Sequence, residues 1–145
     1  MFSQTAEYAL RAVVWLANNN DAPMTTSQIA KATQVPPDYL SKVLWALGRS
    51  GLVHAQRGKN GGFTLATPAQ ELSILDVINA VDPVQRIVSC PLGLKGHEQL
   101  CPLHRRLDDA LRQIEETFAG AMISEFSSDQ LPIAPLCPVK EAAHA

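Results

Sequence analysis

The sequence predicts a mainly α-helical fold with one small β-hairpin, on three observations. Apolar residues recur at helical spacing in several segments that are separated by turn-forming residues. The glycine-rich run RGKNGG at 57–62 joins two short strand patterns at 52–56 and 63–66, as the tip of a hairpin does. No apolar run is long enough to cross a membrane.

The first three helices are expected close together in the first third of the chain. Apolar spacing predicts a helix over 2–18, and the polar run that follows it, up to Pro23, ends it. Thr25 or Thr26 can cap a short second helix that continues to Ala32. After a turn, a third helix is expected at 37–49, with proline tolerated in its first turn.

The second half begins with a short helix and ends with a long one. Ser73 and Asp76 fit a capping box that opens a helix as far as Val81. Residues 82–101 contain several prolines and glycines and are expected to be a linker, followed by a long helix at 102–126. Its apolar stripe consists of Leu103, Leu107, Leu111, Ile114, Phe118 and Met122. This stripe exceeds what a small domain needs for its own core, so we interpret it as a homodimer seam.

Composition and charge narrow the class of protein. Apolar residues make up 46% of the 145 residues and charged residues 18%, which excludes a largely disordered chain. Residues 1–66 contain six Lys or Arg and three Asp or Glu. Residues 67–145 contain six Lys or Arg and eleven Asp or Glu. A basic first half joined to an acidic second half favours a module that binds a polyanion. The N-terminal helix has neither a basic leader region nor a cleavage site, so we expect a cytoplasmic protein without membrane association.

Two short helices, a turn, a third helix and a glycine-tipped hairpin together make a winged helix-turn-helix. Such a third helix can enter the major groove of DNA, which would expose Asp38, Ser41 and Lys42 there. The wing would present Arg57 and Lys59 to a phosphate or to the electronegative minor groove. A winged helix that binds proteins instead of DNA is the alternative. Trp15 and Trp45 are expected to pack in the core or at an interface.

Several motifs resemble one family. The segment EYALRA at 7–12, the turn GLV at 51–53 and the wing RGKNGGFTLA at 57–66 occur in this order. Together they closely resemble the Rrf-two type of bacterial transcription regulators, the family that includes IscR, NsrR and CymR. The resemblance implies a homodimeric repressor or activator of transcription that binds double-stranded DNA. It covers the chain to about residue 126.

The resemblance also implies a set of DNA contacts. Residues of the third helix and of the preceding turn would meet base edges, the wing arginine would enter the minor groove, and the second helix would meet phosphates. The residues concerned are Pro36, Asp38, Ser41 and Lys42 for bases, Arg57 for the minor groove, and Thr26, Ser27, Gln28 and Tyr39 for phosphates.

The linker carries the candidate sensing site. Relatives that hold an iron–sulfur cluster have three cysteines here, and Cys90 and Cys101 match the outer two. One interpretation is a 2Fe–2S or 4Fe–4S cluster on these thiols, with Glu7 of a partner subunit or a histidine as a further ligand. A zinc site with His97 and His104 is the second interpretation. The third is a loop without a cofactor, whose two thiols can form a disulfide.

The chain is thus expected to contain a DNA-binding domain at 1–81, a sensor loop at 82–101, a dimerisation helix at 102–126 and an irregular tail at 127–145. Cys137 lies in that tail and is expected to be a bystander. The sequence lacks a nucleophile–base pattern, a phosphate-binding loop and an HExxH motif, so we expect no enzyme. We expect a regulator that responds to redox state, nitric oxide or iron–sulfur status. A regulator without a cofactor, a protein-interaction module and a metal-trafficking protein remain alternatives.

Overall fold

The computed structural model of the protein describes residues 2–96, 98–129, 131–132 and 135–136. Its elements, in chain order, are α1 (Gln4–Asn18), α2 (Thr26–Thr33), α3 (Pro37–Arg49), β1 (Val53–Gln56), β2 (Gly62–Leu65), α4 (Ile74–Val81), α5 (Pro102–Ala119) and the 3-10 helix η1 (Ile123–Phe126). The predicted fold class, mainly helical with one hairpin, is confirmed.

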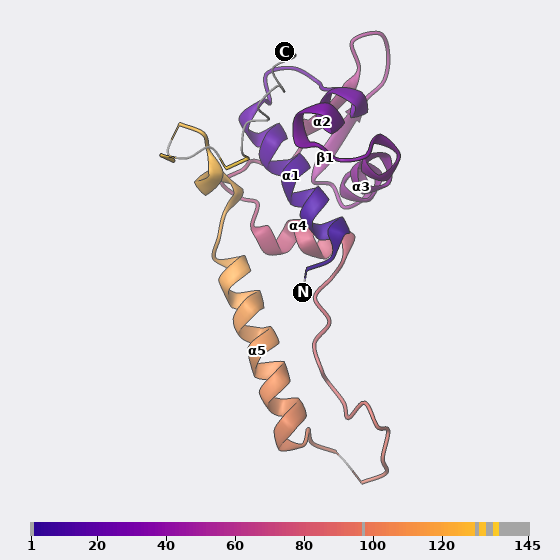
Figure 1. The fold of residues 1–145 in the computed structure, drawn as a ribbon, viewed down its shortest axis with the longest axis vertical. Helices are drawn as coiled ribbons and strands as arrows, with labels where there is room; N and C mark the ends of the chain where they lie inside the picture. Colours follow the sequence, from indigo (N-terminus) through magenta and orange to yellow (C-terminus); the bar gives the residue numbers. More distant parts are fainter. Residues whose placement is uncertain (1, 97, 130, 133–134, 137–145) are drawn as a thin grey trace, which may run out of the picture.

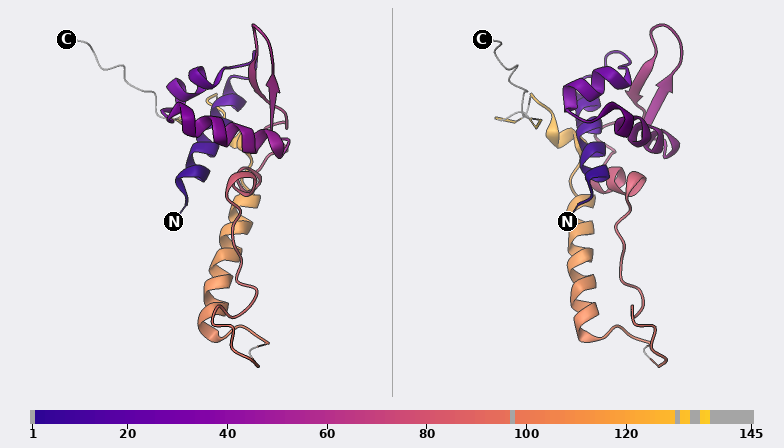
Figure 2. Two further views of the ribbon diagram at one scale, coloured as in Figure 1. Left: turned by 90° about the vertical axis from the view of Figure 1, so that its right-hand side faces the viewer. Right: turned by 45° about the vertical axis from the view of Figure 1, so that its right-hand side comes forward.

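The molecule has two parts (Figure 1). Helices α1–α4, the hairpin and η1 form a globular unit, which we call the winged domain. Helix α5 projects from it, and residues 82–96 run down beside α5, with residues 98–101 leading into its start; this part is called the arm. Figure 2 shows from two further sides that the arm extends away from the winged domain. The turn that closes the arm therefore lies far from α1–α3.

Local capping fixes where the helices of the winged domain begin. The Ser3 hydroxyl accepts a hydrogen bond from the Ala6 amide at 3.1 Å, so α1 begins at Gln4 and not at residue 2. Thr25 and Gln28 form a capping box at α2, and Ser73 forms one with Asp76 at α4. Each box satisfies two backbone amides that the helix itself leaves unpaired.

The core lies where α1 packs against α2, α3 and α4. Its largest fully buried side chains include Leu16 of α1, Ile29 of α2, and Leu40, Leu44 and Leu47 of α3. The two tryptophans differ. Trp15 packs against the core, and its Nε1 donates to the Met24 sulfur at 3.3 Å. Trp45 is 63% exposed, so it is not a core residue.

The wing is an antiparallel pair in which Val53 faces Leu65 and Gln56 faces Gly62. Its base is fixed to the loop before α2, because the backbones of Met24 and Phe63 donate to each other at 3.0 and 2.7 Å. Gly62 is required at this junction, since a Cβ there would lie 2.5 Å from the Met24 carbonyl. The sequence signal for a hairpin tip is therefore confirmed, and its glycine also serves the contact with the α1–α2 loop.

The predicted helix at 102–126 is wrong at its end. Helix α5 ends at Ala119 with Gly120 as its C-cap. The next residues pair with the chain just before α4, because Ile74 donates to the Ala121 carbonyl at 2.9 Å and Ile123 donates to the Leu72 carbonyl at 2.7 Å. The Ile123 side chain is 1% exposed. Hydrophobic spacing could not distinguish this return to the core from one further turn of helix.

The tail expected at 127–145 lies largely outside the described residues. Its start is attached to α1, because Asn18 donates to the Phe126 carbonyl at 3.1 Å and accepts from the Ser128 amide at 2.9 Å. Leu136 packs against the core. Cys137 lies outside the described part of the chain. None of the helices that the structure describes is both long and apolar enough to span a membrane.

Candidate nucleic-acid interface and cysteine loop

Helix α3 divides into a buried and an exposed face. Its buried side chains, Leu40, Val43, Leu44 and Leu47, pack into the core. Asp38, Ser41 and Lys42 are exposed on the other face. The Ser41 hydroxyl donates to the Pro37 carbonyl at 3.1 Å, which leaves its oxygen able to accept a hydrogen bond. The structure thus presents the expected base-reading side chains to solvent, where a DNA groove can receive them.

The start of α2 offers backbone and hydroxyl donors. Thr25 is the N-cap, and its amide donates to the Gln28 side-chain oxygen at 2.9 Å. Ser27 is exposed and Thr26 is half-buried. The Gln28 backbone amide donates to the Thr25 hydroxyl at 3.2 Å, whereas the side-chain nitrogen Nε2 takes no part in the capping box. A helix N-terminus of this kind favours an anion, since its free amides and its dipole both attract negative charge.

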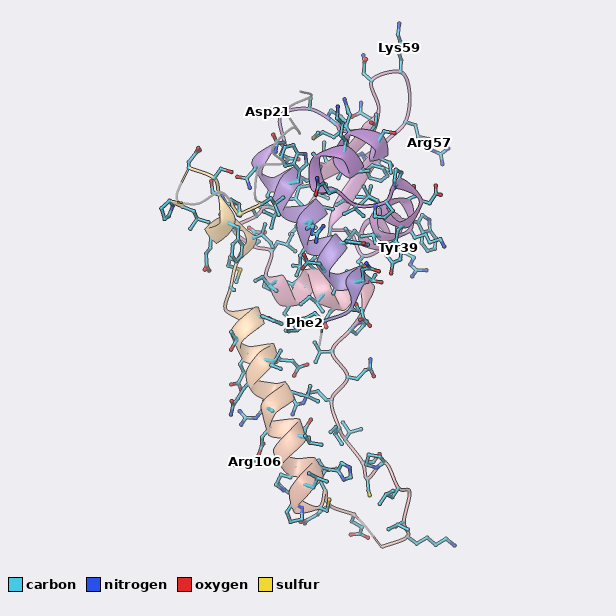
Figure 3. The ribbon with its side chains drawn as sticks, viewed as in Figure 1. Phe2, Asp21, Tyr39, Arg57, Lys59 and Arg106 are labelled. Carbon is cyan, nitrogen blue, oxygen red and sulfur yellow. The ribbon has the colours of Figure 1, made fainter. Side chains whose placement is uncertain are left out.

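The wing presents two cations. Arg57 and Lys59 are exposed, and neither forms an ion pair with another residue in the described part of the chain. Figure 3 shows Lys59 at the tip of the wing and Arg57 lower on it, both directed away from the body of the domain. An unpaired cation on a narrow projection can approach a phosphate or a minor groove without losing an existing partner.

Two other expected contact residues lie before and within the first turn of α3. Pro36 is the exposed N-cap residue of the helix. Tyr39 is 36% exposed, its hydroxyl forms a hydrogen bond with the Thr5 hydroxyl, and its ring meets Tyr8 edge to face at 5.2 Å. Tyr39 therefore links α3 to α1, and this link holds its ring in place at the surface.

A groove of about 540 Å³ brings the three parts of this surface together. It is lined by Thr26 at the start of α2, by Ser41, Trp45 and Arg49 on α3, and by His54 on β1. Trp45 and Arg49 are not among the DNA contacts predicted from the sequence. The signal was present, because both continue the spacing of three and four residues that begins at Asp38 and Ser41.

The cysteine loop closes the far end of the arm. Cys101 is the N-cap residue of α5 and is half-buried, and its sulfur lies 3.2 Å from the His104 Nδ1. Cys90 is also half-buried, and its carbonyl accepts from the Gly93 amide at 3.1 Å in a turn. His97 lies outside the described residues. Of the proposed ligands, the structure brings one thiol and one imidazole into contact.

Glu7 is not part of this arrangement within one chain. It lies on α1 in the winged domain, and its carboxylate pairs with Arg11 at 2.9 Å. In the described part of the chain, no three His, Cys, Asp or Glu side chains lie close enough together to hold a metal ion. A tetrahedral zinc site needs four ligands and a 4Fe–4S cluster normally has four. The described residues of a single chain therefore do not make up a complete ligand set for either.

An ion cluster that the sequence did not reveal attaches the linker to α5. Arg86 binds Asp108 through two contacts of 2.6 and 2.7 Å and Glu115 through one of 2.8 Å. The Ile87 amide donates to Asp108 at 3.0 Å. The guanidinium lowers the pKa of Asp108 to about 2, and the two carboxylates raise the pKa of Arg86. Asp108 and Glu115 are two turns apart on one face of α5, so a single arginine can reach both.

Comparison with known proteins identifies the family. The family model Rrf2, described as an iron-dependent transcriptional regulator, matches residues 2–129. A protein of Aquifex aeolicus (strain VF5), named as a candidate HTH-type transcriptional regulator, is 30% identical over 129 residues, which are 86% of this chain and 90% of that protein.

Two solved structures share the fold. CymR, described as the global cysteine regulator of B. subtilis, has a TM-score of 0.72 at 22% identity, over 89% of this chain and 97% of that one. IscR of T. potens has a TM-score of 0.74 at 21% identity, over 86% of this chain and 84% of that one. The family is one of transcriptional regulators and not of enzymes, as the sequence predicted. With the family model covering residues 2–129, the chain belongs to the Rrf2 family of transcriptional regulators.

Proposed function

We propose that the protein is a homodimeric, sequence-specific DNA-binding regulator. The observation that supports this best is the shared groove: the start of α2, the exposed face of α3 and the first wing strand all line it. A duplex that placed its major groove over α3 would meet all three elements together. The N-terminal half of α3 would then contact base edges, while the wing would contact the neighbouring minor groove or its phosphates.

Each exposed side chain has a role in this arrangement. Ser41 and Lys42 contact bases or groups beside them, and Asp38 accepts from a cytosine amino group. Arg57 enters the minor groove, and Lys59 binds a phosphate. Further phosphate or base contacts come from Thr26, Ser27, Gln28, Pro36 and Tyr39. These assignments follow the family resemblance together with the exposure of these side chains, of which only Thr26 is half-buried.

Salt-dependent binding tests the DNA function. Labelled duplex selected from a random library is titrated with protein at several salt concentrations, and binding is read by fluorescence anisotropy. Affinity should fall steeply with salt, because each cation bound to a phosphate releases counterions. Arg57→Ala should weaken binding by about 1–3 kcal/mol, and Lys59→Ala should lower the salt slope by about one unit.

Lys95→Ala is the matched control, because Lys95 is exposed on the arm, away from the wing. Its binding should equal that of the wild type. If the wild type shows no salt-dependent binding to any duplex, the winged domain is a protein-interaction module instead.

The cysteine loop is the proposed sensor, with Cys90 and Cys101 as the responding thiols. The loop lies between α4 and α5, and Cys101 lies against His104 at the start of α5. A chemical change here can alter how α5 leaves the loop, and the arm connects this point to the winged domain. Sensing requires that the two thiol states favour arrangements with different DNA affinity. The family description as iron-dependent favours iron–sulfur status as the signal. Redox state and nitric oxide are the other candidate signals, because both can modify cysteine thiols.

Ligand content separates the three interpretations of the loop. Protein purified under nitrogen is examined by visible spectroscopy and by counting iron, sulfide and zinc per chain, with Cys90→Ala and Cys101→Ala as comparisons. Colour with iron and sulfide that both variants lose supports a cluster, completed by Glu7 of the partner subunit, His97 or His104. Zinc alone supports a zinc site. Metal-free protein whose DNA affinity changes with oxidant supports a thiol switch. If the protein is metal-free and its DNA affinity does not change with oxidant, the loop is only a structural connector.

A further inference from the structure

Trp45 and Arg49 form an exposed pair at the C-terminal end of α3. The Trp45 side chain is 63% exposed, which is unusual for the largest apolar residue type on a helix of a packed domain. The guanidinium carbon of Arg49 lies 4.4 Å from the centre of the Trp45 ring. This distance is well within the range of a cation–π contact, in which the ring face attracts the charge. Arg49 forms no ion pair with another described residue.

The pair continues the face that is proposed to contact DNA. Asp38, Ser41, Lys42, Trp45 and Arg49 follow one another at intervals of one to four residues and are all exposed. Trp45 and Arg49 also line the groove that Thr26 and Ser41 line. None of the described residues that line this groove is acidic. No carboxylate among these residues opposes a polyanion, and Arg49 supplies a positive charge at the end of α3.

The direction of α3 decides which part of DNA the pair would meet. A recognition helix places its N-terminal residues against base edges, so its last turn comes out of the groove beside the sugar–phosphate backbone. Arg49 is the last residue of α3. A guanidinium at this point is suited to phosphate, because its parallel N–H groups match two phosphate oxygens.

We propose that Arg49 binds a backbone phosphate of the duplex at the rim of the major groove, and that Trp45 is the positioning residue that holds its guanidinium there. Trp45 stabilises one orientation of a long flexible side chain before DNA binds, so less conformational freedom is lost on binding. This inference rests on the proposed DNA-binding function.

Salt titrations test the role of Arg49. Arg49→Ala should weaken binding to operator and to unrelated duplex alike, on the order of tenfold for a charge-assisted hydrogen bond, and should lower the salt slope by about one unit. Arg105→Ala, which removes the same charge from α5, is the matched control and should bind like the wild type. If the wild type binds DNA but Arg49→Ala and Arg105→Ala bind equally well, the inference fails while the proposed function stands.

A double-mutant cycle tests the role of Trp45. Trp45→Ala should weaken binding about two- to fivefold, the effect of an exposed cation–π contact, and Trp45→Phe should restore most of it. In the Arg49→Ala background, Trp45→Ala should add no further loss, because the arginine that it positions is gone. Additive losses would overturn the positioning role and make Trp45 an independent contact.

Fluorescence gives a readout that does not depend on affinity. The chain has two tryptophans, and Trp15 is packed against the core while Trp45 is exposed. Acrylamide should quench wild-type protein more strongly than Trp45→Phe, and saturating duplex should remove most of that difference. If the quenching of Trp45 is unchanged at saturation with DNA, the pair does not lie in the interface and the inference is overturned. The inference is also overturned if a protein partner, and not duplex, protects Trp45 from acrylamide.

Discussion

At the scale of single residues, Asp38 is the group that most needs an explanation on a surface for DNA. It is exposed in the first turn of α3, where the helix dipole favours an acid but a phosphate does not. A carboxylate in the groove can still accept from a cytosine amino group, which no phosphate offers. Its contribution would then be to specificity and not to affinity.

Asp38→Ala should therefore raise the affinity for unrelated duplex and relax the preference at one base pair by about 1–3 kcal/mol. Selection from a random duplex library, followed by anisotropy on the selected sites, measures both effects. Asp21→Ala is the control, since Asp21 is an exposed acid in the loop after α1, away from the exposed face of α3 (Figure 3). Identical selected sites for Asp38→Ala and the wild type would reject the specificity role.

Ile123 lies in the segment predicted as the end of the long helix, but the structure places it in the core of the winged domain. Its side chain is 1% exposed and packs with Leu72 and Val77 in the core of the winged domain. Ile123→Ala should lower the free energy of unfolding by about 2–5 kcal/mol, as other large-to-small core changes do. Val88→Ala, at an 88% exposed position, should change it by less than about 0.5 kcal/mol. Urea titrations of the three proteins followed by circular dichroism measure this, and equal midpoints would contradict the placement.

At the scale of elements, the sequence predicted those features that depend on near neighbours. The capping boxes at Thr25 and Ser73 join residues three apart, and the hairpin tip lies within six residues, so both are visible as local patterns. The return of the chain to the core after Gly120 depends on pairing between residues 72–74 and 121–123. The Arg86 cluster joins residues 22 and 29 positions apart. Periodicity contains no information on such distant pairs.

The residues of the candidate site also divide into those that local sequence patterns predict and those that they do not. The exposed face of α3 and the wing cations follow from helix spacing and from the hairpin, and the structure leaves them exposed. Trp45 was expected in a core or interface because of its residue type alone. The partner of Cys101 within the chain could be suggested by the three-residue spacing to His104. Glu7 is related to the cysteines only by family resemblance, and a single chain does not bring them together.

The Arg86 cluster makes the attachment of the linker depend on acid. Arg86 lowers the pKa of Asp108 in the folded protein to about 2, whereas an Asp in the unfolded chain has a pKa of about 3.9. Between these two pH values the carboxylate is mostly ionised in the folded protein and mostly protonated in the unfolded chain. The pair therefore contributes its full stabilisation above about pH 4 and loses it as pH falls towards 2.

Carbon-13 NMR titration of the Asp108 carboxyl tests this. The signal should titrate with a midpoint of about 2 in the wild type, and Arg86→Met should return it to the ordinary range near about 4. In Arg86→Met, the amide of Ile87 should also exchange faster with solvent at neutral pH, because its acceptor is no longer held in place. An ordinary midpoint in the wild type would show that the cluster does not persist in solution.

At the scale of the whole molecule, the arm lacks a cover for its apolar side chains. Helix α5 has no buried residue, and Leu103 and Leu107 are 64% and 48% exposed. Its 18 residues span about 27 Å, while Leu111 and Ile114 face a cavity beside Phe2 at the start of the chain. A second copy of α5 is the proposed cover. The outer half of α5, around the exposed Leu103 and Leu107, is the part that a second copy would cover.

Substitution of this outer half should separate the dimer. The double variant Leu103→Glu/Leu107→Glu removes two leucines that each contribute roughly 1.5–3 kcal/mol when buried, and it adds like charges at the seam. The dimer dissociation constant should rise by at least about a hundredfold, so that sedimentation velocity shows a monomer at micromolar concentration. The winged domain does not contain these residues, so its unfolding should be unchanged.

The same variant separates assembly from DNA contact. A monomer still presents one intact α3 and wing, so it should bind a single half-site with the salt slope of one domain, while the wild type should bind a two-half-site operator with about twice that slope. Gln113→Glu, an exposed change of charge on α5, is the control and should remain dimeric. A double variant that sediments as a dimer and keeps the full slope would place the seam on another surface of the molecule.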